Sequence, residues 1–120
     1  MADKTRAESF GEERAALNAI VLQYAGRPLK RFLSLDGQVY RAGALDAPIK
    51  ELLGLVASLV LRCDDCIMYH TIECHKAGVS DAALVEALTI GLVVGGSITI
   101  PHLRRALQAW DELNNASEQG

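Results

Sequence analysis

Apolar residues recur at helical spacing near the start of the chain, in the segment from residue 5 to residue 25. Those that fall roughly on one helical face are Phe10, Leu17, Ile20, Val21 and Tyr24. Spacings of three and four residues are typical of an amphipathic helix, and Gly26 with Pro28 supplies its stop. We therefore expect an amphipathic surface helix over residues 5–25.

The middle of the chain predicts two further helices. Residues 29–44 are expected to form a short helix that breaks at Asp36-Gly37, a dipeptide typical of turns, and is followed by a loop. The next helix follows Asp46, a favourable N-cap, has Pro48 in its first turn and continues through Leu61. We expect it to be buried on most sides, because its few polar residues are Lys50, Glu51 and Ser58.

Glycines and a capping serine divide the following region into two helices. One begins at Cys63 or Cys66 and ends before Gly78, and Ser80 caps the other over residues 81–94.

The C-terminal region shows the clearest helical pattern. After Pro101, the apolar positions at helical spacing are Leu103, Ala106, Leu107, Trp110 and Leu113. The polar segment 114–120 is expected to be a frayed tail. The pattern as a whole predicts an all-α protein of about six helices.

Length and composition indicate one domain over residues 1–120, because a chain of this length is too short for two ordinary cores. Half of the residues are hydrophobic but only 5% are aromatic, which suits packed helices rich in Leu, Val, Ile and Ala. A chain this small and apolar is expected to cover part of that surface in a homo-oligomer.

The charge distribution argues against a nucleic-acid role, and the apolar runs argue against a membrane role. The net charge is -3 and the twelve basic residues are scattered, without the basic stripe that nucleic acids require. The apolar runs at 52–61 and 84–100 are interrupted by glycines or polar residues, so no membrane span is predicted. The charged N-terminal segment lacks the pattern of a secretory signal. We therefore expect a cytoplasmic protein.

The segment CDDCIMYH holds the candidate chemistry. Cys63 and Cys66 have the spacing of a dithiol that cycles with a disulfide. His70 follows Cys66 by one helical turn and can take its proton, so we assign Cys66 as nucleophile and Cys63 as resolving thiol. The intervening carboxylates, Asp64 and Asp65, oppose thiolate formation unless they face solvent or cap the helix.

Other polar or reactive residues have a structural explanation as well as a chemical one. Glu51 could transfer protons if desolvated, but an early helical Glu also complements the helix dipole. Cys74 has no close cysteine partner and is expected to be a buried structural residue. His75 and His102 lack an evident acid or thiol partner and are expected at the surface or at helix ends.

A zinc site is not predicted, although two further possible ligands, His70 and Cys74, lie near the Cys63 and Cys66 pair. On a single helix, Cys66 and Cys74 would be about 12 Å apart along the axis. Both thiolates would need to lie about 2.3 Å from the same ion, so we expect no metal and no other cofactor.

The stretch from Lys50 to Leu113 resembles the carboxymuconolactone decarboxylase superfamily, specifically its alkylhydroperoxidase D-like branch. In that branch a Glu stands twelve residues before a CxxC, and a His follows four residues after the second Cys. The matching positions here are Glu51, Cys63, Cys66 and His70. The flanks PIKELLGLVASLVLRCDDC and GGSITIPHLRRAL also resemble small single-domain members, and the family core spans about residues 46–113.

The resemblance implies a helical fold that assembles into hexamers, the favoured state, or trimers. It implies that Cys66 attacks a hydroperoxide, that Cys63 closes a redox-active disulfide, and that Glu51 and His70 form a proton relay. This raises Glu51 from dipole partner to catalytic residue. One departure is Asp65, which stands where alkylhydroperoxidase D proper carries a further His.

These observations predict a thiol-dependent oxidoreductase, either an antioxidant peroxidase of the peroxiredoxin type or a dithiol-disulfide exchange enzyme. Its substrate would be a hydroperoxide or a disulfide, and an external dithiol would reduce it again. One alternative is a cofactor-free decarboxylase or lactone enzyme, against which Cys63 and Cys66 count. Another is a non-catalytic oligomer that senses redox state.

Overall fold

The computed structural model describes residues 3–119, which fold into six α-helices and one short 3₁₀ helix, with no strand in that range. The helices are α1 (Arg6–Tyr24), α2 (Arg27–Val39), α3 (Ala47–Leu61), α4 (Asp64–Lys76), α5 (Asp81–Gly95), η1 (Ser97–Thr99) and α6 (Ile100–Gln119). The prediction of an all-α fold is confirmed. Within the described residues, no helix is long and apolar enough to cross a membrane.

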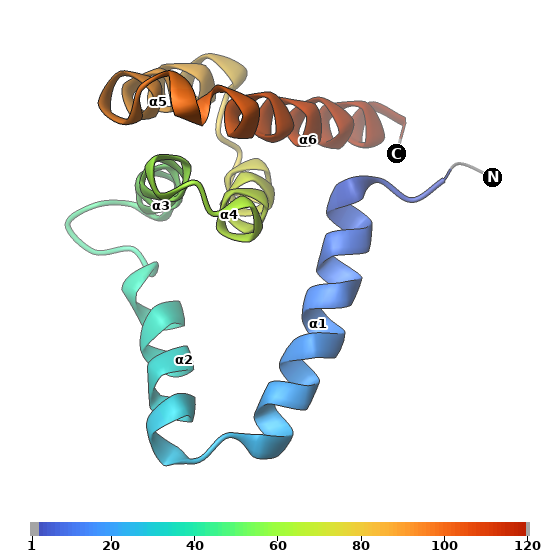
Figure 1. Ribbon diagram of the computed structural model, residues 1–120, viewed down its shortest axis with the longest axis vertical. Helices are drawn as coiled ribbons and strands as arrows, with labels where there is room; N and C mark the ends of the chain where they lie inside the picture. The colour runs from blue at the N-terminus through green and yellow to red at the C-terminus, as the bar shows by residue number, and fades with distance from the viewer. Residues whose placement is uncertain (1–2, 120) are drawn as a thin grey trace.

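The core lies among α3, α4, α5 and α6, which pack together at one end of the molecule (Figure 1). Leu55 and Leu59 of α3 are fully buried against Leu84 and Leu88 of α5, and Trp110 of α6 joins the same cluster. Burying one leucine side chain stabilises a fold by about 1.5–3 kcal/mol. This cluster therefore fixes α3, and the start of α4 that follows it, in the molecule.

The helix beginnings follow the predicted caps. The Asp46 side chain accepts a hydrogen bond from the Ile49 amide at 3.0 Å, and the Ser80 hydroxyl accepts one from the Ala83 amide at 3.1 Å. Each satisfies one of the amides that a helix N-terminus leaves without a partner in the helix. Both predicted N-caps are confirmed.

Helix α2 differs from the prediction, because it runs from Arg27 to Val39 without a break at Asp36-Gly37. The Lys50 ammonium, which reaches over from α3, donates hydrogen bonds to the carbonyls of Val39 and Arg41 at 2.8 and 2.7 Å. The Val39 carbonyl is one of those that a helix C-terminus leaves unpaired, and Arg41 lies just beyond the helix. A contact from another helix thus supports the last turn, which the glycine alone would have weakened.

Helix α6 is also longer than predicted and continues through Gln119 instead of fraying after Leu113; Gly120, the last residue of the predicted tail, lies outside the described residues. Asn114 explains the extension. Its amide donates to the Asp81 carboxylate, which also accepts a hydrogen bond from the Trp110 indole. These contacts fasten the C-terminal half of α6 to the beginning of α5.

Helices α1 and α2 form a hairpin that extends away from the core (Figure 1). No residue of α2 is buried, and Ala7 is the buried residue of α1. The radius of gyration is 15.1 Å, against about 14 Å for a compact chain of this length. The predicted surface helix over residues 5–25 is confirmed. On its predicted apolar face Phe10 is half-buried, whereas Leu17, Ile20, Val21 and Tyr24 stay exposed within one chain.

The expectation that α3 is buried on most sides is confirmed, except for one exposed stripe at residues 49, 53, 57 and 61. Leu55, Ser58 and Leu59 are buried, whereas Leu53 and Leu61 are 55% and 76% exposed. The main contacts of α3 are with its neighbours α4 and α5.

Candidate active site

A tight turn between α3 and α4 presents the two cysteines at the beginning of a helix. Arg62 caps α3 in the left-handed conformation, with φ 59° and ψ 38°. Its position lets the Cys63 amide donate to the Ser58 carbonyl at 3.1 Å. Cys63 is then the N-cap of α4, which confirms the prediction that a helix begins at the cysteines.

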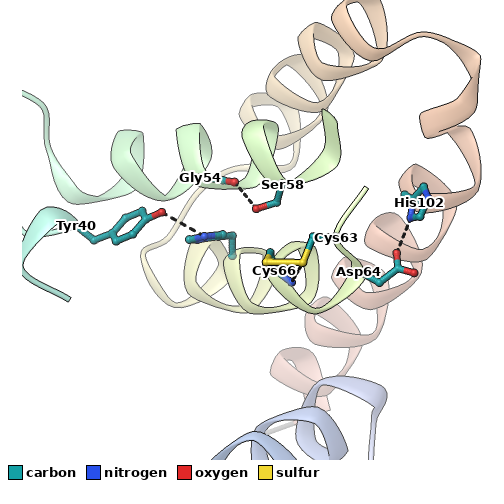
Figure 2. The surroundings of a disulfide bond; sticks show 8 residues. Tyr40, Gly54, Ser58, Cys63, Asp64, Cys66 and His102 are labelled. Carbon is teal, nitrogen blue, oxygen red and sulfur yellow. Dashed lines mark hydrogen bonds and ion pairs between the residues drawn. A yellow bond between two sulfur atoms is a disulfide. The ribbon is translucent and has the colours of Figure 1, made fainter. Parts of the chain in front are cut away.

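Cys63 and Cys66 are joined by a disulfide in the first turn of α4, with Cα atoms 5.3 Å apart (Figure 2). The Cys66 amide also donates to the Cys63 sulfur at 3.3 Å. Cys66 is exposed and Cys63 is half-buried. The partial positive charge of the helix N-terminus favours a thiolate in this turn, and Cys66 is the more accessible of the two sulfurs.

The structure brings Glu51 and His70 together from different helices. The Nδ1 atom of His70 lies 2.9 Å from Glu51 Oε2, and both side chains are almost buried, with exposures of 10% and 12%. A carboxylate only accepts hydrogen bonds, so Nδ1–H donates to Glu51 and leaves the Nε2 lone pair of the neutral ring free to accept a proton.

The Glu51 and His70 contact requires a glycine in α3. A Cβ atom built on Gly54 would lie 2.7 Å from Cε1 of the His70 ring and 2.9 Å from both of its nitrogens. Real Cβ atoms do not come this close to other atoms. Gly54 therefore makes the space in which the imidazole reaches the carboxylate.

Tyr40 is a site residue that the sequence analysis missed. Its hydroxyl lies 3.3 Å from His70 Nε2, so it donates to the nitrogen that Glu51 leaves free. Burial raises the pKa of the Tyr40 hydroxyl, and the carboxylates of Asp36 and Glu51 raise it further, so the group stays a donor at neutral pH. Nothing in the sequence pattern connects Tyr40 with His70, which lies thirty positions away.

Asp64 is turned away from Tyr40 and toward α6 (Figure 2). It lies 2.7 Å from His102 Nδ1 and 3.1 Å from the Arg105 guanidinium. Burial acts to raise the pKa of the Asp64 carboxyl, but the hydrogen bonds from His102 and Arg105 prevail and hold that pKa below its usual range. The expectation that His102 lacks an acid partner is therefore wrong, because chain folding brings α6 beside the beginning of α4.

A cavity of 440 Å³ opens beside Cys66, and we call it the Cys66 cavity. Its walls come from α1, α2 and α4 and include Leu17, Asp36, Tyr69 and His70. The volume is that of a site for a small organic molecule, commonly about 300–1,000 Å³. A dithiol, a base and a cavity that exposes one sulfur together suit thiol-disulfide or thiol-peroxide chemistry.

Cys74 is chemically separate from the pair. It is fully buried in the core, and burial, followed by the charges of Glu51 and Glu73, raises its pKa to about 12. His75 packs edge-on against Trp110 and lies 3.1 Å from the Asn114 side-chain oxygen. Within residues 3–119, no three His, Cys, Asp or Glu side chains gather as metal ligands do.

Sequence comparison identifies one matching protein family. The model of the carboxymuconolactone decarboxylase family matches residues 28–109. An uncharacterised protein of Cupriavidus necator is 32% identical over 111 residues, covering 92% of this chain and 95% of that protein. An uncharacterised protein from the cox locus of Paracoccus denitrificans is 28% identical over 85 residues, covering 71% of this chain and 77% of that protein.

Structural comparison leads to the same family. A crystal structure of a Thermotoga maritima protein is 54% identical, covers 93% of this chain and 98% of that one, and has a TM-score of 0.91. A second crystal structure of that protein (TM-score 0.89, coverage 93% and 95%) describes it as a carboxymuconolactone decarboxylase family protein for which a role in an antioxidative response has been suggested. A family protein of Legionella pneumophila, at 23% identity, shares the fold with a TM-score of 0.83 over 92% of this chain and 98% of that one.

The three cysteines should differ sharply in reactivity. We expect iodoacetamide at pH 8 to modify Cys63 and Cys66 in the reduced native protein. Cys74 should react on the order of 10³-fold more slowly than an ordinary exposed thiol, because so little of it is thiolate at this pH. Peptide mass spectrometry over time measures the rates, with unfolded protein as the control in which Cys74 reacts normally. Comparable rates for all three thiols in the native protein would contradict the assignment.

Proposed function

The chain belongs to the carboxymuconolactone decarboxylase family, and we propose that within it the chain is a thiol-dependent oxidoreductase of the alkylhydroperoxidase type. The observation that carries the proposal is the Cys63–Cys66 disulfide in the first turn of α4. One helical turn farther on, His70 is paired with Glu51 at 2.9 Å. The disulfide is the redox group, and the proposal includes no other cofactor.

The first step forms the Cys66 thiolate. In the reduced protein, His70 takes the Cys66 proton at Nε2, and the Glu51 carboxylate stabilises the resulting imidazolium through Nδ1–H. Tyr40 occupies Nε2 in the disulfide form, in which no thiol proton has to be accepted. Forming the Cys66 thiolate therefore requires one of two changes at Tyr40. Its hydroxyl either moves away from His70 Nε2 or passes the Cys66 proton on to that nitrogen.

The next steps transfer two electrons to a hydroperoxide. The Cys66 thiolate attacks the terminal oxygen, the O–O bond breaks, and the alcohol leaves with the proton held by His70. Cys66 is then a sulfenic acid. Cys63 attacks the Cys66 sulfur, the S–O bond breaks, water leaves with the Cys63 proton, and the disulfide forms. An external dithiol then reduces the disulfide by thiol-disulfide exchange. We place this cycle in the cytoplasm, where such reductants are maintained.

The similar Thermotoga maritima protein supports the direction of this proposal. It is 54% identical to this chain, and the role suggested for it is antioxidative. A dithiol that reduces hydroperoxides would serve such a role.

Replacing either cysteine should stop the cycle at a different step. We expect Cys66→Ser to abolish NADPH-coupled turnover of an organic hydroperoxide with a dithiol reductant, because the attacking sulfur is lost. Cys63→Ser should consume one equivalent of peroxide and then stall as the Cys66 sulfenic acid, which dimedone trapping and mass spectrometry detect.

Other outcomes of this experiment point to other functions. Turnover that survives in Cys66→Ser would contradict the dithiol mechanism and leave a cofactor-free lactone or decarboxylase activity to be tested. A wild-type protein whose disulfide is reducible but which reduces no hydroperoxide would be a disulfide-exchange protein or a redox sensor.

The proton relay makes a second prediction. Gly54→Ala should lower peroxide turnover by about 10²-fold, because the new Cβ displaces the His70 ring from Glu51 and general-base catalysis commonly contributes a factor of about 10² to 10⁴. Glu51→Gln should lower turnover in the same way and change the pH dependence of the rate.

The matched control is Gly37→Ala, since Gly37 also lies in a helix but has no atom within 4 Å of an added Cβ. This variant should keep wild-type turnover, and circular dichroism should show that all three variants are folded. A Glu51→Gln profile that superimposes on the wild-type pH–rate profile would contradict the relay.

We also propose that the protein is a homo-oligomer, with a hexamer favoured over a trimer. The support is the α1–α2 hairpin, whose apolar side chains outside the Cys66 cavity remain exposed in the described part of the chain: Ile20, Leu22, Tyr24, Phe32, Leu35 and Val39. Isolated helices of this length are only marginally stable in water. A second copy that covers this surface would supply the missing packing.

Light scattering after size-exclusion chromatography tests the oligomer. The wild type should have six times the chain mass of 12.9 kDa, or three times that mass for a trimer. Phe32→Glu should lower this mass, because it places a charge on a side chain that is 64% exposed in the single chain. Gln38→Glu, on the same helix, is the control. A wild-type mass of one chain would refute the proposal.

A further inference from the structure

The Cys66 cavity has a charged lining that bears on which oxidants reach the sulfur. Glu13 and Arg14 come from α1, Asp36 comes from α2, and Asp65 lies beside Cys66 in α4. The lining therefore holds three carboxylates and one guanidinium. Within residues 3–119, none of these three carboxylates forms an ion pair that would cancel its charge.

The single cation of the cavity is held against its wall. The Arg14 guanidinium carbon lies 4.2 Å from the centroid of the Tyr69 ring, which is the geometry of a cation–π contact. Asp64, the other carboxylate beside the disulfide, is paired with Arg105 and His102 toward α6 and does not line this cavity. The unbalanced negative charge is thus on the cavity side of the disulfide.

The charge of Asp36 acts on the site. Burial raises the pKa of the Tyr40 hydroxyl, and the Asp36 carboxylate adds to that rise. At Tyr69, burial and then the Glu73 charge raise the pKa, the Arg14 guanidinium opposes the rise, and Asp36 makes a smaller contribution. Charges are screened over about 8 Å at physiological ionic strength, so a carboxylate in the wall acts on a substrate that has entered the cavity. An anionic substrate would meet this field together with the charge of the Cys66 thiolate.

We propose that the Cys66 cavity selects cationic and uncharged organic oxidants, disulfides in particular, and disfavours anionic ones. This inference rests on the proposed dithiol function and adds the substrate class. The apolar side chains Phe10 and Leu17 of the same wall would contact the organic part of the substrate, while the carboxylates act on its charge.

The reaction with a disulfide is balanced without a further reagent. The Cys66 thiolate attacks one sulfur of the substrate, its S–S bond breaks, and the first thiol leaves with the proton that His70 took from Cys66. Cys63 then attacks Cys66 in the mixed disulfide, and the second thiol leaves with the Cys63 proton. The protein dithiol is oxidised to the Cys63–Cys66 disulfide and one substrate disulfide is reduced to two thiols.

Three small disulfides of different charge test the selection. Reduced protein is mixed with cystamine, bis(2-hydroxyethyl) disulfide or 3,3′-dithiodipropionate, and acid-quenched samples are analysed for the Cys63–Cys66 disulfide. Each rate is divided by the rate at which dithiothreitol reduces the same compound, which removes differences in intrinsic reactivity. We expect the normalised rates to fall from cation to neutral compound to anion, with a cation-to-anion ratio on the order of 10-fold or more at low salt. The ratio should approach one as salt is added.

Charge-matched variants separate the cavity from the net charge of the protein. Glu13→Gln combined with Asp36→Asn should lower the cation-to-anion ratio by about threefold or more. Glu86→Gln combined with Asp111→Asn removes the same charge from exposed positions outside the cavity and should leave the ratio unchanged.

The outcomes distinguish this inference from the function on which it rests. Equal normalised rates, or faster reaction of the anion through Arg14, would overturn the charge selection and leave the dithiol chemistry standing. Equal effects of the two double variants would overturn the assignment to the cavity. If none of the three compounds oxidises the reduced protein, both disulfide reduction and the proposed substrate class are refuted. Hydroperoxide turnover is tested separately by the cysteine variants above.

Discussion

The close contact of α3 with α4 is the constraint on which the site depends. At Gly54 the two helices approach so closely that the His70 ring occupies the space of a side chain. Only this approach lets Glu51, on α3, reach Nδ1 of an imidazole on α4. The core holds the contact in place, because the buried leucines of α3 belong to the same cluster as Ile67 and Cys74 of α4. Core packing and proton-transfer geometry are therefore parts of one arrangement.

The α1–α2 hairpin serves the site although it has almost no core of its own. It supplies two walls of the Cys66 cavity and brings Tyr40 to His70. Lys50 holds the end of α2 through two backbone carbonyls, which connects the hairpin to the same helix that carries Glu51. The hairpin thus influences both the access of substrate and the nitrogen that receives the proton.

Local signals predicted the elements well where capping residues lie near their helices in sequence. Asp46 and Ser80 each bond an amide three residues ahead, so their effect is visible in a short window. The end of α2 and the end of α6 were predicted wrongly because distant residues decide them. Lys50 supports the first, and Asp81 accepts hydrogen bonds from α6 near the second. Neither contact can be predicted from the local sequence of the helix that it stabilises.

For the site, the sequence by itself determined the dithiol spacing, the helix that begins at Cys63 and the histidine one turn beyond Cys66, since all of these are properties of a single helix. Only the tertiary structure decided that Glu51 meets His70, that Tyr40 occupies its other nitrogen and that Asp64 is paired with residues of α6. Each of these contacts joins side chains nineteen to forty-one positions apart. The packing of buried apolar surface, which is not directional, chooses which helices meet, and the polar contacts follow from that choice.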